Sequence, residues 1–401
     1  MAPPLGLYVH IPWCPTRCIY CDFNTYVDGS DSLKAVYHQA LLKELREAAR
    51  ALGHPPLETI FFGGGTPTTL EPAMLLEIVE TVRSHFDLQP HAEITTEANP
   101  GTLTLPYLRA LRKGGINRLS LGVQSFDDDE LRLLSRLHDS QTARDAVRVA
   151  REAGFDNLSL DLIFNLPTQP LERWVSTLEA AIALEPDHLS IYSLIVEPGT
   201  PMHRLVARGE LPEPDDDVAA EMYATTISRL DDAGFAHYEI SNWARRGDEA
   251  AWQSPRLASA HNLIYWRNRP YLGVGAGAFS TVAGQRWANV KRPQRYIEMV
   301  RQGAGLAPGR DPRTEESIAP DTVLAEHMML GLRLLREGVS AGEVQQRFGV
   351  ALAERFAAAI QQGQARGLLS WLPTPDGDRR LRLTPEGRFL ANQATLPFLE
   401  G

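Results

Sequence analysis

Short apolar runs alternate with longer amphipathic stretches through the first half of the chain. The apolar runs are typical of buried strands, and apolar residues three or four positions apart predict helices, as at Tyr37, Leu41 and Leu45. Gly53 marks the end of that helix. We expect strands at residues 5–11, 57–62, 92–97, 118–123, 158–163 and 188–194, and helical material at 33–52, 72–86, 105–113, 127–153, 171–184 and 217–233.

The alternation of strands and helices predicts an α/β fold. Strands joined through helices pair in parallel with right-handed crossovers. Six such units are too few for a closed barrel of eight. The pattern therefore predicts a partial (β/α)6 barrel, with functional residues at the carboxyl ends of its strands.

The βα pattern stops after Phe235. We expect one more strand at residues 237–240, at the sheet edge. The expected domains are a partial barrel (1–240), an aromatic-rich covering segment (241–301), a linker (302–320) and a small C-terminal domain (321–401).

The C-terminal domain has its own pattern of elements. Three helical patterns (321–336, 340–348, 350–366) precede two short strands (368–372, 380–383) and a last helix opened by Thr384-Pro385-Glu386. This order resembles a winged-helix module. It has no basic stripe, so we expect packing or partner contact rather than DNA binding.

Composition narrows the class of protein. The chain has 401 residues, with 43% hydrophobic and 22% charged residues, and a net charge of −10. The negative charge argues against nucleic acid as a partner. No apolar run is long enough to span a membrane, and the N-terminus lacks the features of a secretory leader. We expect a cytoplasmic protein, and transient contact with a membrane-bound acceptor stays open.

All three cysteines lie within eight residues, at Cys14, Cys18 and Cys21. Their odd number excludes a disulfide framework, and zinc would normally require a fourth ligand. Position 23, where a fourth cysteine would fall, is Phe23. Tight cysteine runs of this kind ligate iron–sulfur clusters. Three ligands on a four-iron cluster leave one iron open to an exchangeable small molecule.

The cysteine spacing, with Tyr20 before the last cysteine, resembles the signature of radical S-adenosylmethionine (SAM) proteins. The resemblance implies that Cys14, Cys18 and Cys21 hold a [4Fe–4S] cluster. It also implies that the amino and carboxylate groups of SAM chelate the fourth iron. The alternative is three free cysteines in a surface loop, which the neighbouring motifs make less favourable.

A glycine run, Gly63-Gly64-Gly65-Thr66-Pro67, directly follows the second expected strand. Glycines let the backbone approach a ligand closely, although such a run alone is as often a simple turn. The motif resembles the glycine motif by which radical SAM proteins contact the amino group of SAM. Its GGGTP form narrows the resemblance to the branch around oxygen-independent coproporphyrinogen oxidase.

Single polar residues occur at the ends of the other strands. Carboxylates and amides there suit hydrogen bonding to a ribose, a carboxylate or a ring nitrogen, although each alone could cap a helix or form an ion pair. We expect Arg136 on the helix after the fourth strand. By the resemblance, the SAM-binding residues are Tyr8, Gly64, Gly65, Thr66, Glu97, Gln124, Arg136 and Asp161.

Two groups within this branch must be separated. The oxidases usually have a longer N-terminal arm and a fourth cysteine, whereas this chain starts seven residues before Tyr8 and has Phe23. Residues 261–266, HNLIYW, match the HNxxYW motif of the HemW family of haem chaperones. The resemblance implicates His261 in haem binding.

The chemistry of the HNLIYW motif suits haem. A neutral imidazole is a good axial ligand for haem iron, and Tyr265 and Trp266 can pack on a porphyrin face. The alternative is that His261 is an ordinary loop histidine satisfied by backbone hydrogen bonds. Phe279 stands where the family often has a histidine, which puts a second axial ligand there in doubt.

The expected function is that of a haem chaperone, which binds a [4Fe–4S] cluster, SAM and haem and transfers haem to an acceptor haem protein. No residue is assigned a catalytic role. One alternative is an oxygen-independent coproporphyrinogen III oxidase, which decarboxylates propionates to vinyls. Another is a different radical SAM activity, such as a methyltransferase that uses two SAM molecules.

Overall fold

The computed structural model describes residues 4–27, 29–375 and 377–399. The chain forms two compact units, one of residues 1–226 and 270–316, the other of residues 227–269 and 317–401. This division differs from the expected domain boundaries. The expected covering segment 241–301 is split at residue 270, because the strand that begins at Tyr271 pairs with the first strand of the chain.

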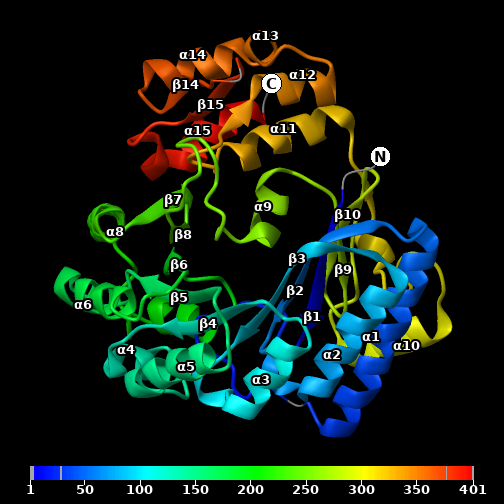
Figure 1. Cartoon of the computed structure of the whole chain (residues 1–401). Helices are drawn as coiled ribbons and strands as arrows, with labels where there is room; N and C mark the ends of the chain where they lie inside the picture. The colour runs from blue at the N-terminus through cyan, green and yellow to red at the C-terminus, as the bar shows by residue number, and fades with distance from the viewer. Residues whose placement is uncertain (1–3, 28, 376, 400–401) are drawn as a thin grey trace. The chain divides into compact units, whose positions relative to one another are not determined.

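The first unit contains a sheet whose central strands are all parallel (Figure 1). The parallel strands follow the order β9-β1-β2-β3-β4-β5-β6, and β10 and β11 extend the sheet antiparallel beyond β9. Their bounds are β1 (Leu5–Ile11), β2 (Pro56–Gly64), β3 (Asp87–Ala98), β4 (Arg118–Gln124), β5 (Leu158–Phe164), β6 (His188–Ser193), β9 (Tyr271–Val274), β10 (Phe279–Val282) and β11 (Gln285–Ala288). The predicted α/β fold with a parallel sheet is confirmed.

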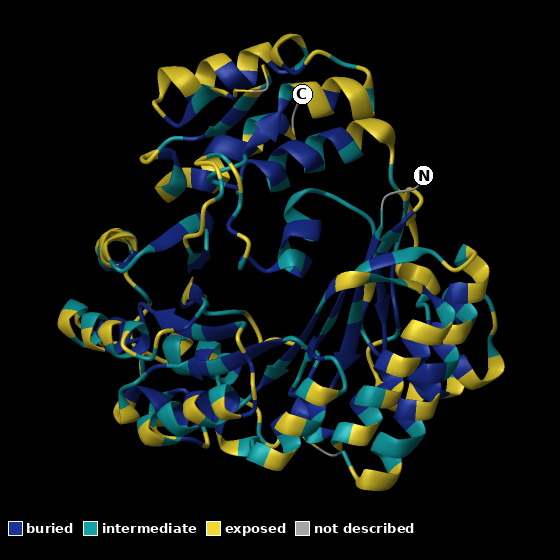
Figure 2. Cartoon of the chain, viewed as in Figure 1, coloured by how far each residue is buried: buried dark blue, intermediate teal, exposed yellow. Residues whose placement is uncertain are grey.

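Helices cover the outer face of this sheet (Figure 1). They are α1 (Asp31–Leu52), α2 (Pro72–His85), α3 (Leu105–Lys113), α4 (Asp128–Leu133), α5 (Ser140–Glu152), α6 (Leu171–Ile182) and α10 (Pro293–Gln302). Helix α7 (Pro201–Ala207) lies instead at the cysteine loop, where the amide of Met202 donates to the carbonyl of Ile19 at 2.9 Å. The unit also has the 3-10 turns η1 (Pro67–Thr69), η2 (Pro100–Thr102) and η3 (Pro312–Thr314). Helix α8 (Asp216–Asp232) contains the boundary between the units. Figure 2 shows buried strands and helices exposed on one side only, as the helical periodicity requires.

The expected strands are found, and most differences lie at their ends. Residues 127–153 form two helices rather than one continuous stretch. Helix α4 ends before Ser135, whose φ of 57° is left-handed, and Asp139 caps the start of α5. Arg136 therefore lies in the connection between two helices, and the expectation that it is on a helix is wrong. The expected linker carries η3 and the short strand β12 (Glu316–Ser317).

The second unit begins with a hairpin of β7 (Phe235–Glu239) and β8 (Asn242–Arg245), which pair antiparallel, followed by α9 (Ala260–Trp266). Its C-terminal part has the helices and strands expected of a winged-helix-like domain, around one apolar core. They are α11 (Pro320–Gly331), β13 (Val339–Ser340), α12 (Ala341–Phe348), α13 (Leu352–Arg355), α14 (Ala357–Ala365), β14 (Leu369–Pro373), β15 (Arg379–Leu383), η4 (Gly387–Leu390), α15 (Ala391–Thr395) and η5 (Leu396–Phe398).

The strands of this part form a sheet in the order β13-β15-β14. The expected last helix is a series of short turns rather than one helix. Within the part of the chain that the structure describes, none of the helices has both the length and the apolar character needed to cross a membrane.

Candidate functional site

The cysteines lie on a loop that leaves the carboxyl end of β1 and is closed at its base by backbone pairing. The amide of Cys14 donates to the carbonyl of Tyr26 at 3.0 Å, and the amide of Tyr26 donates to the carbonyl of Pro12 at 2.8 Å. Cys14, Cys18 and Cys21 are all partly buried free thiols. The fold thus brings all three predicted ligands onto one closed loop.

Two side chains from elsewhere in the barrel donate hydrogen bonds to the sulfur atoms. Nη1 of Arg136 lies 3.4 Å from Sγ of Cys18, and Oγ1 of Thr66 lies 3.6 Å from Sγ of Cys14. Donors of this kind orient and stabilise metal-bound thiolates. Burial raises the pKa of the Cys14 thiol, and neighbouring Cys18 raises it further.

The donor set fits an iron–sulfur cluster better than a single ion. Within the described residues, no group of three or more His, Cys, Asp or Glu side chains could hold a metal ion. A four-iron cluster makes a different demand, because each thiolate binds its own iron. A cavity of about 90 Å³ adjoins Cys18, and Asn99, Thr102, Arg136 and His138 also line it.

The glycine run packs tightly against β1 and the cysteine loop. The amide of Gly65 donates to the carbonyl of Ile11 at 2.8 Å, and a Cβ on Gly65 would lie 2.6 Å from the carbonyl oxygen of Trp13. A Cβ on Gly64 would lie 2.4 Å from the ring of His10. Glycine is required here because the backbone approaches other backbone and a ring this closely.

Glu97 near the end of β3 and Asp161 in the middle of β5 are two buried carboxylates whose charges interact. Burial raises the pKa of Glu97 to about 8, and the charge of Asp161 raises it further in the same direction. Burial also raises the pKa of Asp161, although the Ser120 hydroxyl donates to it at 2.9 Å. Oε2 of Glu97 accepts from the amide of Gly64 at 3.3 Å. A protonated Glu97 beside a charged Asp161 would offer a ligand both a donor and an acceptor.

Gln124 and Arg136 complete the set at the strand ends. Gln124 has a left-handed φ of 71°, at a register shift between β4 and β5 that changes the direction of its side chain. Nη2 of Arg136 donates to Oδ1 of Asn99 at 2.5 Å and to the carbonyl of Gly122 at 2.6 Å. Asn99 in turn donates to Oγ1 of Thr66 at 2.8 Å.

Asn99 therefore joins the predicted site although sequence reasoning did not select it. Its position two residues after Glu97, just beyond the end of β3, is the signal that could have found it. Tyr8, another residue predicted to bind SAM, contacts a histidine two residues further along β1. Its hydroxyl lies 3.0 Å from Nδ1 of His10, whose Nε2 donates to the carbonyl of Asn24 at 3.0 Å. Burial lowers the pKa of His10 to about 4, so this ring is neutral.

Behind the cysteine loop lies a buried polar network that sequence reasoning also missed. Glu44 on α1 accepts from Tyr296 Oη at 2.5 Å, from Asn289 Nδ2 at 2.7 Å and from the amide of Gly275 at 2.8 Å. Burial raises the pKa of Glu44 to about 7. The network fixes the glycine loop after β9, to which Asn24 of the cysteine loop is bonded through the carbonyl of Ala276 at 3.0 Å.

The HNLIYW motif belongs to the second unit and forms α9, not an irregular segment. His261 is 1% exposed, and its Nε2 lies 2.8 Å from the hydroxyl of Tyr265, one turn along the helix. Trp266 lies under the guanidinium of Arg333, 4.6 Å from the ring centroid. Haem ligation through Nε2 therefore requires the bond to Tyr265 to be replaced and His261 to become accessible.

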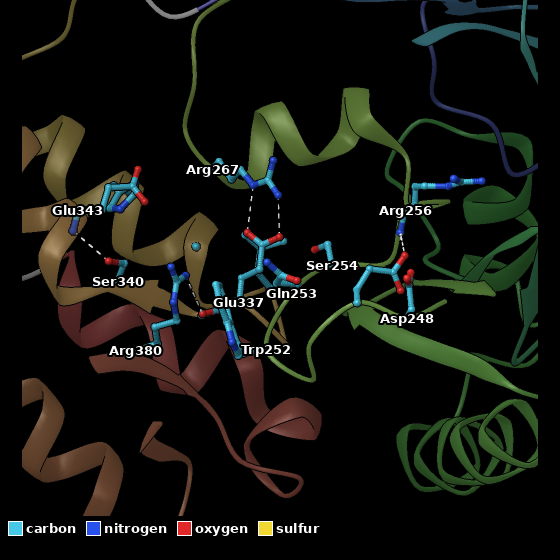
Figure 3. A pocket seen from close by; sticks show the side chains of 15 residues that line it. Asp248, Trp252, Gln253, Ser254, Arg256, Arg267, Glu337, Ser340, Glu343 and Arg380 are labelled. Atoms are coloured by element: carbon cyan, nitrogen blue, oxygen red, sulfur yellow. Dashed lines mark hydrogen bonds and ion pairs between the residues drawn. The ribbon is translucent and has the colours of Figure 1, made fainter. Parts of the chain in front are cut away.

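A pocket of about 530 Å³ begins at the C-terminal end of α9, within the second unit (Figure 3). Arg267 reaches Glu337 through two hydrogen bonds, of 2.6 and 3.0 Å, which hold the pKa of Glu337 below its usual range although burial opposes this. The guanidinium of Arg380 stacks over Trp252 at 4.8 Å. Because its best placed charges already pair with each other, the pocket offers little to a charged ligand.

His327 is the imidazole that lines this pocket. It is 3% exposed, and burial lowers its pKa to about 4. Its Nε2 has no hydrogen-bond partner among the described residues, and its Nδ1 lies 3.4 Å from Arg347. A neutral imidazole here makes His327 a necessary control for any experiment on His261.

Known proteins resemble the chain over nearly its whole length. Residues 8–181 match the radical SAM superfamily, and residues 318–390 match the HemN C-terminal domain. The heme chaperone HemW of Bacillus subtilis is 36% identical over 395 residues, covering 98% of each chain. HemW of Mycobacterium tuberculosis is 40% identical over 393 residues, covering 97% of this chain and 93% of the relative.

Among solved structures, the coproporphyrinogen III oxidase HemN of Escherichia coli, described as a radical SAM enzyme, superimposes with a TM-score of 0.81. It is 26% identical, and the match covers 99% of this chain and 90% of HemN. This likeness explains the fold that the two share. The higher identity and nearly complete coverage of the HemW relatives place the chain more narrowly, and it belongs to the HemW family of radical SAM proteins.

Proposed function

We propose that this protein is a haem chaperone, which binds haem and transfers it to an acceptor haem protein. The observation that carries the proposal is the similarity to heme chaperone HemW over 98% of the chain, which includes the HNLIYW helix. The acceptor is a haem-binding apoprotein, and nucleic acid is not a partner. The reduced, cytoplasmic setting expected from the cysteines stays a prediction.

In this proposal the first unit holds two cofactors. Cys14, Cys18 and Cys21 would ligate a [4Fe–4S] cluster, supported by the hydrogen bonds from Arg136 and Thr66 to two of the sulfur atoms. When bound, such a cluster offers one open iron to the amino and carboxylate groups of SAM. The groups that would hold SAM are Gly64, Gly65, Thr66, Glu97, Asn99, Gln124, Arg136 and Asp161, with Tyr8 supporting His10.

Haem would bind in the second unit through His261. The hydroxyl of Tyr265 then has a defined role, because it occupies Nε2 when haem is absent. Haem must displace this hydrogen bond, which is worth about 1 kcal/mol and so weakens haem binding by roughly fivefold. Such a bond favours release to an acceptor over permanent retention.

The test compares haem binding by the wild-type protein and three variants through the Soret band. His261→Ala should lose the spectrum of histidine ligation, whereas His327→Ala, the matched control, should keep it. Tyr265→Phe should bind haem several-fold more tightly, because Nε2 is no longer occupied. Equal haem affinity in wild type and His261→Ala would contradict the proposal.

The second candidate is a coproporphyrinogen III oxidase, favoured by the overall likeness to HemN. Against it, the position of the fourth cysteine is Phe23, whose side chain is 63% exposed. Anaerobically reconstituted protein with SAM and a reductant should leave coproporphyrinogen III unchanged. Formation of protoporphyrinogen would decide for the oxidase.

A further inference from the structure

A groove of about 770 Å³ lies in the first unit, outside the parallel sheet and beside the cysteine loop. Three segments form it: the start of β10, the residues from the end of β11 into α10, and the turn η3. The cysteine loop borders it, because Asn24 and Tyr26 both donate to the carbonyl of Lys291, at 3.0 and 3.2 Å. None of the site residues discussed above was assigned to this groove.

Backbone hydrogen bonds between the three segments fix the floor of the groove. The amide of Gly277 donates to the carbonyl of Val290 at 3.1 Å, and the amide of Asn289 donates to the carbonyl of Ala278 at 2.8 Å. On the other side, the amide of Asp311 donates to the carbonyl of Ala288 at 2.9 Å. The groove is therefore preformed and does not depend on mobile side chains for its shape.

One wall of the groove is apolar. Phe279 is 52% exposed and pairs across the strands with Ala288, and Val290, Met299 and Pro312 also line the groove. A half-exposed phenyl ring on a fixed strand is unfavourable in water unless something covers it. A flat aromatic ligand could cover this ring by stacking on it.

The rest of the lining is strongly basic, in a chain whose net charge is −10. Arg313 is neutralised by Asp311 through two hydrogen bonds, of 2.6 and 2.9 Å, which lower the pKa of Asp311 to about 2. Arg295 pairs with Glu298 at 2.5 Å. Lys291 and Arg292 remain, and neither side chain has an ion pair or hydrogen bond within the described residues.

We propose that this groove is a second tetrapyrrole site, which takes a planar porphyrin with two propionates independently of any metal. The proposal rests on the proposed function, because haem supply is what makes a porphyrin the expected ligand. Two unpaired cations match the two carboxylates of the ligand, and Phe279 faces the macrocycle. None of the described residues that line the groove has an imidazole or a thiolate, and Met299 offers only a weakly donating thioether, so iron contributes little to binding.

Independence of iron separates this site from His261 experimentally. Metal-free protoporphyrin IX is the probe for the groove, and ferric haem is the probe for His261, both with the full-length protein. Porphyrin fluorescence gives the first affinity, and the Soret band of histidine ligation reports the second. The wild type should bind metal-free porphyrin, and the dimethyl ester, which lacks both charges, should bind about tenfold more weakly or worse.

The double variant Lys291→Glu/Arg292→Glu should weaken binding of metal-free porphyrin by about tenfold or more. Phe279→Ser should weaken it through lost stacking. Arg301→Glu, on the last turn of α10 and outside the groove, is the matched control and should bind like the wild type. His261→Ala should also keep the wild-type affinity for metal-free porphyrin.

The outcomes distinguish this proposal from the proposed function. If His261→Ala loses the Soret signal while the groove variants bind metal-free porphyrin like the wild type, the groove proposal is refuted and the chaperone proposal stands. If the groove variants lose porphyrin binding while His261→Ala binds haem like the wild type, the groove proposal stands and the chaperone proposal is refuted. No porphyrin binding by the wild type would also refute the groove site.

Discussion

The buried carboxylate of Glu44 makes the stability of the first unit depend on pH. Glu44 is 1% exposed and accepts hydrogen bonds from three neutral donors, and no cation among the described residues shifts its pKa. Burial raises its pKa from 4.5 to about 7. Because the folded state prefers the protonated form, stability is complete below the unfolded pKa and is lost as the pH rises through the folded pKa.

The size of this loss follows from the two pKa values. Linkage gives a destabilisation of about 1 kcal/mol at pH 5 and about 3 kcal/mol at pH 8. Glu44→Gln removes the titration but places an amide opposite the Asn289 donor, which adds a cost that does not change with pH. We therefore expect wild type to lose about 2 kcal/mol relative to Glu44→Gln between pH 5 and pH 8.

The measurement is urea unfolding at pH 5, 6, 7 and 8. Unfolding is monitored by hydrogen exchange and mass spectrometry of peptides from α1 and α10. These peptides report the first unit alone, which matters because a chain with two compact units need not unfold in one step. Glu47→Gln, one turn further along α1, is the matched control.

The amide of Gly305 and the side chain of Arg50 lower the pKa of Glu47, so its pH dependence should have the opposite sign. If the free energy of unfolding depends on pH equally in wild type and Glu44→Gln, titration of Glu44 does not govern the stability of the first unit.

Three further predictions concern the site of the first unit. Gly65→Val should lose iron as well as SAM affinity, because its Cβ would press on the carbonyl of Trp13 in the cysteine loop; unchanged iron content after reconstitution would contradict this. Arg136→Gln should weaken SAM binding in equilibrium dialysis by about tenfold, since charge-assisted hydrogen bonds are lost, and an unchanged affinity would exclude Arg136 from the site. Asp161→Asn should lower the pKa of Glu97, so the midpoint of SAM affinity measured against pH should move to lower pH. An unchanged midpoint would show that the Asp161 charge does not affect Glu97.

Much of the first unit could be predicted because its signals are local. Strand β1 was expected at its observed bounds, since six of its seven residues, all but His10, are apolar, aromatic or glycine and the cysteine loop follows directly. Glycines at 63–65 and polar residues at strand ends marked the site, because parallel strands bring their carboxyl ends to one edge. The expectations that rested on this rule needed no knowledge of side-chain packing.

The features that sequence reasoning missed depend on contacts between distant segments. Nothing around Glu44 distinguishes it from other acidic residues of an amphipathic helix, because its partners lie more than 230 residues away. Arg136 was placed on a helix because periodicity does not reveal the turn at Ser135. The joining of β9 to β1 was equally hidden, and with it the division of the chain at residue 270.

The two expectations for Phe279 and His261 lead to one conclusion about haem. The sequence drew attention to His261 as the residue that binds iron, but the fold buries it and engages its Nε2. Phe279 stands where a histidine was expected from the family, and this phenyl ring is half exposed beside two unpaired cations. The described residues that line the groove include no imidazole, so the groove would hold the ligand by its macrocycle and propionates. The buried imidazole on α9 would hold it by its iron. Under the proposed function, two separate attachments would each be weak enough to break during transfer, whereas a single site with both would retain haem.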